Sequence, residues 1–166
     1  MAFIGIISDS KKYDLIKRFI NTENNKNQFT LININSRSIA NIKNVKFDVI
    51  VILTLPKNKD EYIEYLEQIC SEVKILVINS DVEINGLLQE VKTNIITFGV
   101  NHLSTVTFSS ATDDSVLIAV QRNYKGLKGN IVEVGEYDIQ IEKINRNYLH
   151  EILIFFILKK INNLWK

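Results

Sequence analysis

Two polar side chains, Asn79 and Asp81, follow a segment that is typical of a buried strand. The carboxyl end of a parallel strand is where α/β proteins bind their ligands. An Asn amide can pair with the edge of an adenine, and an Asp carboxylate can accept a hydrogen bond from a ribose or an amine. Both residues also cap helices, and a helix is expected from Val82. Helix capping is therefore the favoured interpretation, and nucleotide binding is the alternative.

Four cationic side chains are candidates for binding an anion: Lys11, Lys12, Lys57 and Arg122. The first two lie in the turn after the first predicted strand, where a phosphate or dinucleotide would bind. That turn has neither GxGxxG nor GxxxxGK[ST], and Asp9 within it would repel a phosphate. A structural, solvated role is favoured for each residue. The alternative, a site for an anionic substrate, predicts that the four side chains converge.

Residues for metal or nucleophilic chemistry are few, since the chain has one cysteine and two histidines. Cys70 falls on the apolar stripe of a predicted helix, so we expect it to be buried and inert. His102 is expected in a turn, and His150 is expected to be packed within the last helix. No Ser/His/Asp, Cys/His or paired-carboxylate set follows from the spacing. We therefore predict no catalytic residue and no metal site.

The first hundred residues alternate between strand-like and helix-like segments. This order predicts a Rossmann-like, doubly wound, mostly parallel sheet. The expected strands are 3–8, 29–34, 47–55, 74–79 and 94–98, and the expected helices begin near Ser10 and span 59–73 and 82–92, with 36–46 irregular or a short helix.

After Gly99 the apolar pattern changes to a period of two, which predicts an antiparallel meander with strands at 105–109, 115–121, 130–134 and 137–141. A hydrophobic helix is expected over 145–165. The economical prediction is a single domain, 1–166, with a parallel α/β part (1–99), a β meander (100–143) and a terminal helix (144–166).

Composition limits the function classes. The chain has 166 residues, 46% of them hydrophobic, and a formal net charge of +1. Such a balance argues against a nucleic-acid-binding protein, which needs a concentrated basic face. The longest apolar run is too short for a membrane span, and the first residues lack the features of a signal peptide. A cytoplasmic protein is expected.

The segment FDVIVILTLPKNKDEYIEYLEQICSEVKILVINSDVEINGLL, residues 47–88, resembles the central domain of the Mur ligases. In that family a strand ending in T-N-x-x-x-D-H precedes a helix and a strand ending in N-x-D-D, which Asn79 and Asp81 match in part. The run 94–99, NIITFG, is similar to the family's (v/i)-x-T-(F/Y)-G, and 145–157 is similar to its closing G-x-H-N-x-x-N-x-x-A helix. The resemblance implies an ancestral nucleotide crevice in which Asn79 contacts a base and Asp81 supports it.

The family's catalytic elements are missing from this chain. No P-loop lies in 5–12, no Asp-His pair lies near 56–59, and 166 residues leave no room for the flanking substrate domains. Because phosphoryl transfer depends on these positioning and neutralising groups, the sequence argues against ATP-driven ligation.

Three hypotheses remain open. In the first, the protein is a non-catalytic Mur-ligase-like protein that requires no cofactor. It would bind ATP, another nucleotide or a UDP-linked peptidoglycan precursor, or act through protein contacts. Alternatively, it is an enzyme with an anionic-substrate site that has no P-loop. The third hypothesis is an interaction module or homo-oligomer that acts through a meander edge and the last helix, where Phe155, Phe156, Leu164 and Trp165 lie.

Overall fold

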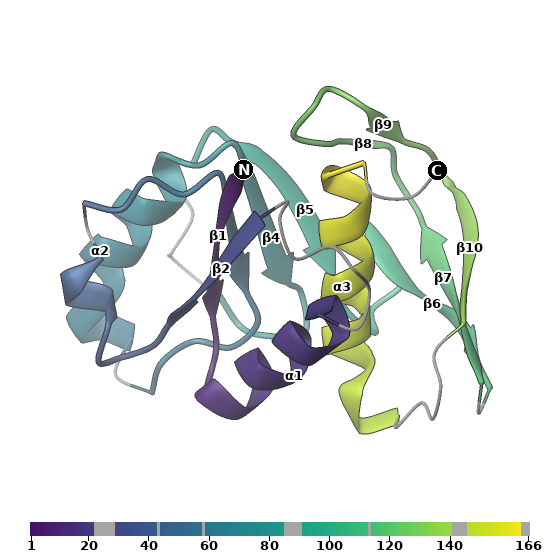
Figure 1. Cartoon of the computed structure of the whole chain (residues 1–166), viewed down its shortest axis with the longest axis horizontal. Helices are drawn as coiled ribbons and strands as arrows, with labels where there is room; N and C mark the ends of the chain where they lie inside the picture. Colours follow the sequence, from purple (N-terminus) through teal and green to yellow (C-terminus); the bar gives the residue numbers. More distant parts are fainter. Residues whose placement is uncertain are drawn as a thin grey trace. The chain divides into compact units, whose positions relative to one another are not determined.

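The computed structural model describes residues 1–21, 29–42, 44–57, 59–84, 91–112, 114–140 and 146–163, and it has the predicted α/β fold (Figure 1). The chain divides into two compact units. The first unit comprises Met1–Ile78 and Val82–Ile95, and the second comprises Asn79–Asp81 and Ile96–Lys166.

Parallel strands form the centre of the first unit. They are β1 (Ala2–Ile7), β2 (Phe29–Ile34), β3 (Val49–Ile52) and β4 (Ile75–Asn79), in the order β4-β3-β1-β2. The chain passes from β1 to β2 on one side and then returns to place β3 on the other side of β1. The carboxyl end of β1 is therefore the point at which the strand order reverses, and ligands of open α/β sheets bind at such points.

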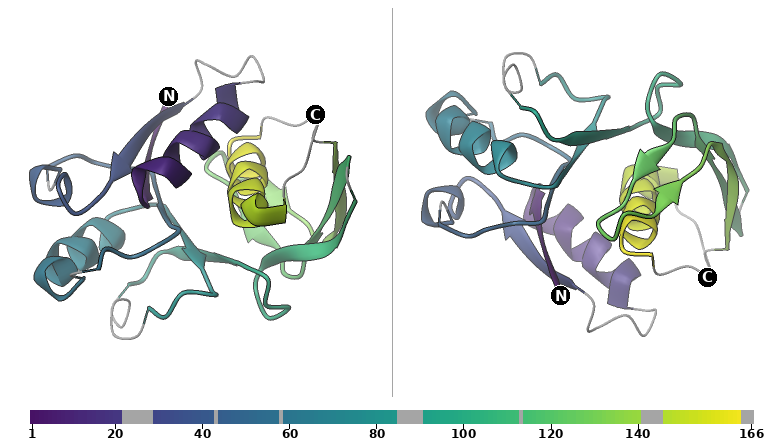
Figure 2. Two further views of the ribbon diagram at one scale, coloured as in Figure 1. Left: turned by 90° about the horizontal axis from the view of Figure 1, so that it is seen from below. Right: turned by 90° about the horizontal axis from the view of Figure 1, so that it is seen from above.

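Helices cover both faces of these strands, which confirms the doubly wound arrangement. Figure 2 shows α1 (Ser10–Asn21) on one face and α2 (Lys59–Ser71) on the other. Asp9 caps α1, because its carboxylate accepts the Lys12 N–H at 3.0 Å. The predicted stripe of α2 is also confirmed: Leu66, Ile69 and Cys70 are buried in a core that includes Ile39 of the short 3-10 helix η1 (Ile39–Asn41).

The strand β3 is shorter than the predicted 47–55. The backbone N–H groups of Leu53 and Thr54 both donate to the Ile7 carbonyl, at 3.1 and 3.2 Å. This doubled contact ends the regular ladder after Ile52, so 53–57 becomes a loop beside the end of β1.

The helix predicted over 82–92 does not begin or end where the sequence suggests. Residues 82–84 and 91–92 are not helical, and the remainder of that prediction lies outside the described residues. Asp81, one of its expected caps, makes its side-chain hydrogen bonds elsewhere, as shown below.

The second unit combines parallel and antiparallel pairing. Its strands are β5 (Asn94–Phe98), β6 (Val106–Ala111), β7 (Ser115–Val120) and β10 (Gly135–Gln140), in the order β10-β7-β6-β5. The β5–β6 pair is parallel, and the β6–β7 and β7–β10 pairs are antiparallel.

One predicted meander strand, 130–134, does not join this sheet. β8 (Tyr124–Lys125) and β9 (Ile131–Val132) instead form a separate hairpin, which lies between β7 and β10 in the sequence. The turn between them begins at Gly126, where an added Cβ would clash with Asn130 Oδ1 and would lie 2.7 Å from the Ile161 carbonyl oxygen. The close approach of these groups requires glycine at this position.

The C-terminal helix α3 (Leu149–Ile161) follows a short 3-10 helix, η2 (Arg146–Tyr148). Figure 2 shows β7 and β10 curving around one side of α3, and the Tyr137 ring centroid of β10 lies 5.4 Å from that of Phe156. Phe155 and Phe156 are both buried, so they do not form the exposed apolar surface that was considered for a partner. Leu164 and Trp165 lie outside the described residues. Among the described residues, no helix has the length and apolar character needed to cross a membrane.

Candidate functional site

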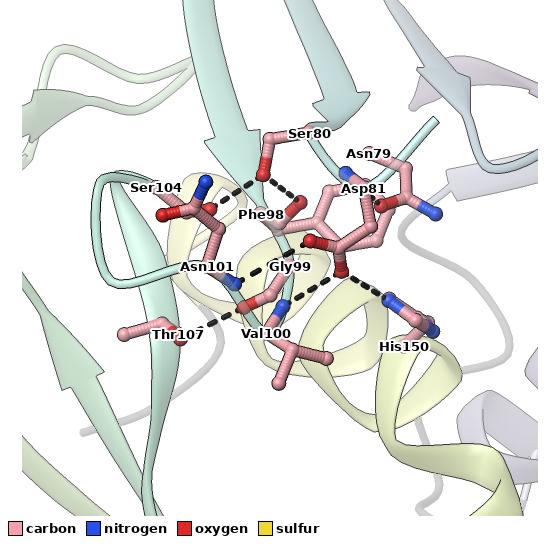
Figure 3. A network of polar contacts seen from close by, with 10 residues as sticks. All are labelled: Asn79, Ser80, Asp81, Phe98, Gly99, Val100, Asn101, Ser104, Thr107 and His150. Carbon is pink, nitrogen blue, oxygen red and sulfur yellow. Dashed lines mark hydrogen bonds and ion pairs between the residues drawn. The ribbon is translucent and has the colours of Figure 1, made fainter. Parts of the chain in front are cut away.

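The carboxylate of Asp81 is the centre of a polar network in the second unit (Figure 3). Asp81 Oδ2 accepts the Val100 N–H at 2.7 Å and lies 2.7 Å from His150 Nε2. Its Oδ1 accepts the Asn101 N–H at 3.4 Å. The network therefore joins the end of β4, the loop after β5 and the first turn of α3.

Neighbouring residues hold this loop in place. Asn79 is only 3% exposed, and its side-chain oxygen accepts the Asp81 N–H at 3.0 Å. The Ser80 N–H donates to the Phe98 carbonyl at 2.8 Å, and the Ser80 hydroxyl shares a hydrogen bond with Ser104. The predicted pair Asn79 and Asp81 is thus brought together, with the carbonyl end of the Asn79 amide directed at the backbone of Asp81.

Gly99 allows the close approach of these groups. A Cβ at this position would lie 2.7 Å from both Asp81 Oδ2 and Ser80 Oγ. Any larger residue would displace the carboxylate, so the glycine of the 94–99 motif serves the packing of Asp81.

Burial raises the pKa of Asp81, but the hydrogen bonds from His150 and from the Val100 and Asn101 N–H groups, with the charge of His150, outweigh it and lower the pKa overall. The side chains of His150 and Asp81 are 32% and 27% exposed. A carboxylate that orients an imidazole is one half of a general-base arrangement. Here it also ties the start of α3 to the loop after β5.

A second candidate site is a crevice of about 310 Å3 in the first unit. It lies where β1, β2 and β3 end, at the reversal of strand order described above. Its walls are formed by three short segments that follow those strands, and the lining residues are Ile7, Ser8, Asp9, Ile34, Asn35, Ser36, Thr54, Leu55, Pro56 and Lys57.

Some polar groups of the crevice already have hydrogen-bond partners within the protein, and others have none in the described residues. Asn35 Oδ1 accepts the N–H groups of Arg37 and Ser38, at 2.9 and 3.2 Å, and so shapes the turn after β2. Within the described part of the chain, the side chains of Ser36 and Lys57 make no hydrogen bond or ion pair. These two side chains are therefore available to a ligand.

The anionic-substrate alternative requires the four cationic residues to converge, and of these Lys57 alone belongs to the described lining of the crevice. Lys57 lines the crevice, whereas Lys11 and Lys12 lie in the first turn of α1 and are not part of its described lining. Arg122 is exposed after β7, in the second unit.

The remaining candidate residues fit their structural interpretations. Burial raises the pKa of the Cys70 thiol to about 12, which makes it a poor nucleophile, as expected. His102 lies exposed in a turn, also as expected. The contact between His150 and Asp81 was not anticipated, because 69 positions separate them and no local spacing reports such a pair.

Comparisons with protein-family models and with curated proteins find no match to this chain.

The residues do not fit the magnesium ion and the ATP phosphates that the Mur ligase resemblance implies. Among the described residues, no three His, Cys, Asp or Glu side chains are grouped so as to hold a metal ion. In the turn after β1, a carboxylate occupies the N–H of Lys12 that a phosphate would need.

Proposed function

We propose that the protein is a non-catalytic binding protein that takes a small organic molecule in the crevice at the ends of β1, β2 and β3. The observation that carries this proposal is the position of the crevice at the reversal of strand order, the preferred ligand position of open α/β sheets. The Asp81 network is assigned the structural role of holding the second unit together, since its polar groups bond to one another.

The size and lining of the crevice favour a ligand of about the size of a nucleoside. A volume near 310 Å3 is at the lower end of the roughly 300–1,000 Å3 range of ligand pockets. Leu55 and Pro56, which are partly exposed, offer apolar surface for a ring, while Ser36, Thr54 and Lys57 offer hydrogen-bonding groups. This combination of apolar walls with a few polar groups is typical of small-molecule sites.

The resemblance to Mur ligases supplies further candidate ligands, namely nucleotides and UDP-linked peptidoglycan precursors. Ligation itself is not part of the proposal, because the turn after β1 lacks the glycines and the Lys-Ser/Thr pair that position a transferring phosphoryl group. The proposed binding is accordingly independent of magnesium.

A thermal-shift screen with adenosine, ATP, ADP and a UDP-sugar, each with and without magnesium, tests the proposal. A ligand at 100 times its Kd stabilises a protein by about 2.7 kcal/mol and moves the melting temperature by several degrees. Ser36→Phe narrows the crevice, and Ser71→Phe places the same side chain on an exposed site at the end of α2. We expect a magnesium-independent shift that Ser36→Phe abolishes and Ser71→Phe keeps. A shift that survives Ser36→Phe would contradict the proposal, and so would the absence of any shift.

Self-association through β10 is a second proposal. β10 is at the edge of the strand order, and the apolar side chains of Ile131 and Val134 beside it in the sequence are 65% and 59% exposed. Edge strands pair readily with other strands. Light scattering would show a dimer that Asp138→Pro disrupts, whereas a monomer at all accessible concentrations would contradict it.

A further inference from the structure

We infer that the crevice takes an uncharged or cationic ligand and that Asp9 is the residue that sets this specificity. The inference rests on the proposed function, since it names the class of ligand for the same crevice. It also narrows the ligands of the proposed function, because it disfavours the nucleotides and UDP-linked precursors, whose phosphate groups are negatively charged.

The position of Asp9 supplies the first argument. Asp9 lines the crevice and directly precedes α1, and its Oδ1 accepts the Lys12 N–H at 3.0 Å. Its backbone carbonyl accepts the Tyr13 N–H at 3.1 Å. The residue therefore places a carboxylate where the first turn of a helix would otherwise attract a ligand phosphate.

The other residues of the turn after β1 do not make the crevice favourable to an anionic ligand. Ser8, buried at the end of β1, donates its hydroxyl to the Asp9 carbonyl at 3.1 Å instead of pointing that donor at a ligand. Residues 6–12 contain no glycine, so side chains obstruct the backbone approach that a phosphate needs. Lys57 is the cation among the described lining residues, and it comes from the loop after β3 rather than from this turn.

Charge at Asp9 can be removed without removing the helix cap. Asn caps helices about as well as Asp, so Asp9→Asn keeps the hydrogen bond to Lys12 and deletes only the negative charge. Asp14→Asn makes the same charge change at an exposed position of α1 outside the crevice lining, and it serves as the matched control.

Calorimetric titration of the full chain with adenosine and with adenosine monophosphate measures the preference. We expect the wild type and Asp14→Asn to bind adenosine at least tenfold more tightly than the monophosphate. In Asp9→Asn the ratio of the two Kd values should fall to about one, with the adenosine Kd changed less than threefold. Equal affinities in the wild type would overturn the inference, as would a preference that Asp9→Asn leaves unchanged.

The same titrations separate this inference from the proposed function. If adenosine monophosphate binds the crevice better than adenosine, this inference fails while the proposed function stands. If no organic ligand binds, the proposed function fails as well.

Discussion

The Asp81 network and the crevice are both built from loops that follow strands, but their polar groups are used differently. In the network, the Asp81 carboxylate accepts hydrogen bonds from two backbone N–H groups and is hydrogen-bonded to His150, so all of its partners come from the protein itself. In the crevice, Ser36 and Lys57 have no such partners within the described residues, and a volume of about 310 Å3 lies between the loops. The difference separates a polar cluster that stabilises a fold from one that is open to a ligand.

Polar residue type alone therefore does not separate the two clusters. Asn79 and Asp81 have the chemistry of a nucleotide site, but the structure engages Asn79 Oδ1 and both Asp81 carboxylate oxygens internally. The loop 54–57 has less distinctive chemistry, and a structural, solvated role is favoured for Lys57 from the sequence, yet the loop lines the crevice. The Asp81 network and the crevice differ in how many of their polar groups already have a hydrogen-bond partner within the protein.

The largest effect is expected from Asp81→Ala. It removes hydrogen bonds to a charged group from two backbone N–H groups and leaves His150 without its carboxylate, so the free energy of unfolding should fall by about 3 kcal/mol. Urea denaturation measures this change. A loss below about 0.5 kcal/mol would show that the network does not stabilise the second unit.

Gly99→Ala should cost somewhat less, about 1–3 kcal/mol, because the new Cβ would displace the Asp81 carboxylate and the Ser80 hydroxyl. A double-mutant cycle with Asp81→Ala sharpens the test. Once the carboxylate is gone, the cost of Gly99→Ala should fall clearly, and additive costs would contradict the assigned contact.

The network should also weaken in acid. The pKa of Asp81 is lowered in the folded protein from its ordinary value of 3.8, so its stabilisation is complete above that value and is lost as the pH falls through the folded pKa. The difference in unfolding free energy between wild type and Asp81→Asn should therefore shrink below about pH 4. Asp48, whose pKa is lowered chiefly by Lys74 against the opposing effect of burial, should show the same trend in the first unit. A difference that grows in acid would contradict the assignment for Asp81.

The smallest effect on stability is expected in the crevice. Lys57 is exposed and has no partner in the described structure, so Lys57→Gln should change the free energy of unfolding by less than about 0.5 kcal/mol. It should nevertheless weaken ligand binding measurably by calorimetry. A large loss of stability would mean that the crevice, like the network, is built of mutually satisfied groups.

The fold was predictable in outline because its signals are local. The bounds of β2 and β5 match the predicted 29–34 and 94–98, and α2 begins at the predicted Lys59, since apolar periodicity and turn residues mark such elements directly. The β8–β9 hairpin escaped prediction because strands of two residues have no detectable period. The end of β3 was not predicted correctly, because it depends on the Ile7 carbonyl, which lies 46 positions from Leu53 in the sequence.

The sites were less predictable, for a related reason. Asp9 was identifiable as a helix cap and as a residue unfavourable to phosphate, since both properties follow from its type and its place before α1. The crevice was not identifiable, because it needs three loops that are distant in the sequence to meet. His150 was likewise interpreted as packed, and only the folded chain places its Nε2 beside Asp81.

Mapping a ligand onto the chain decides between the crevice and the Asp81 network. In an amide NMR titration of the full chain with adenosine, we expect shifts concentrated at Ser8, Asp9, Asn35, Ser36 and Lys57, with Val100, Asn101 and His150 unchanged. Shifts centred on Val100, Asn101 and His150 with the crevice unchanged would contradict it, and would make the Asp81 network the binding site.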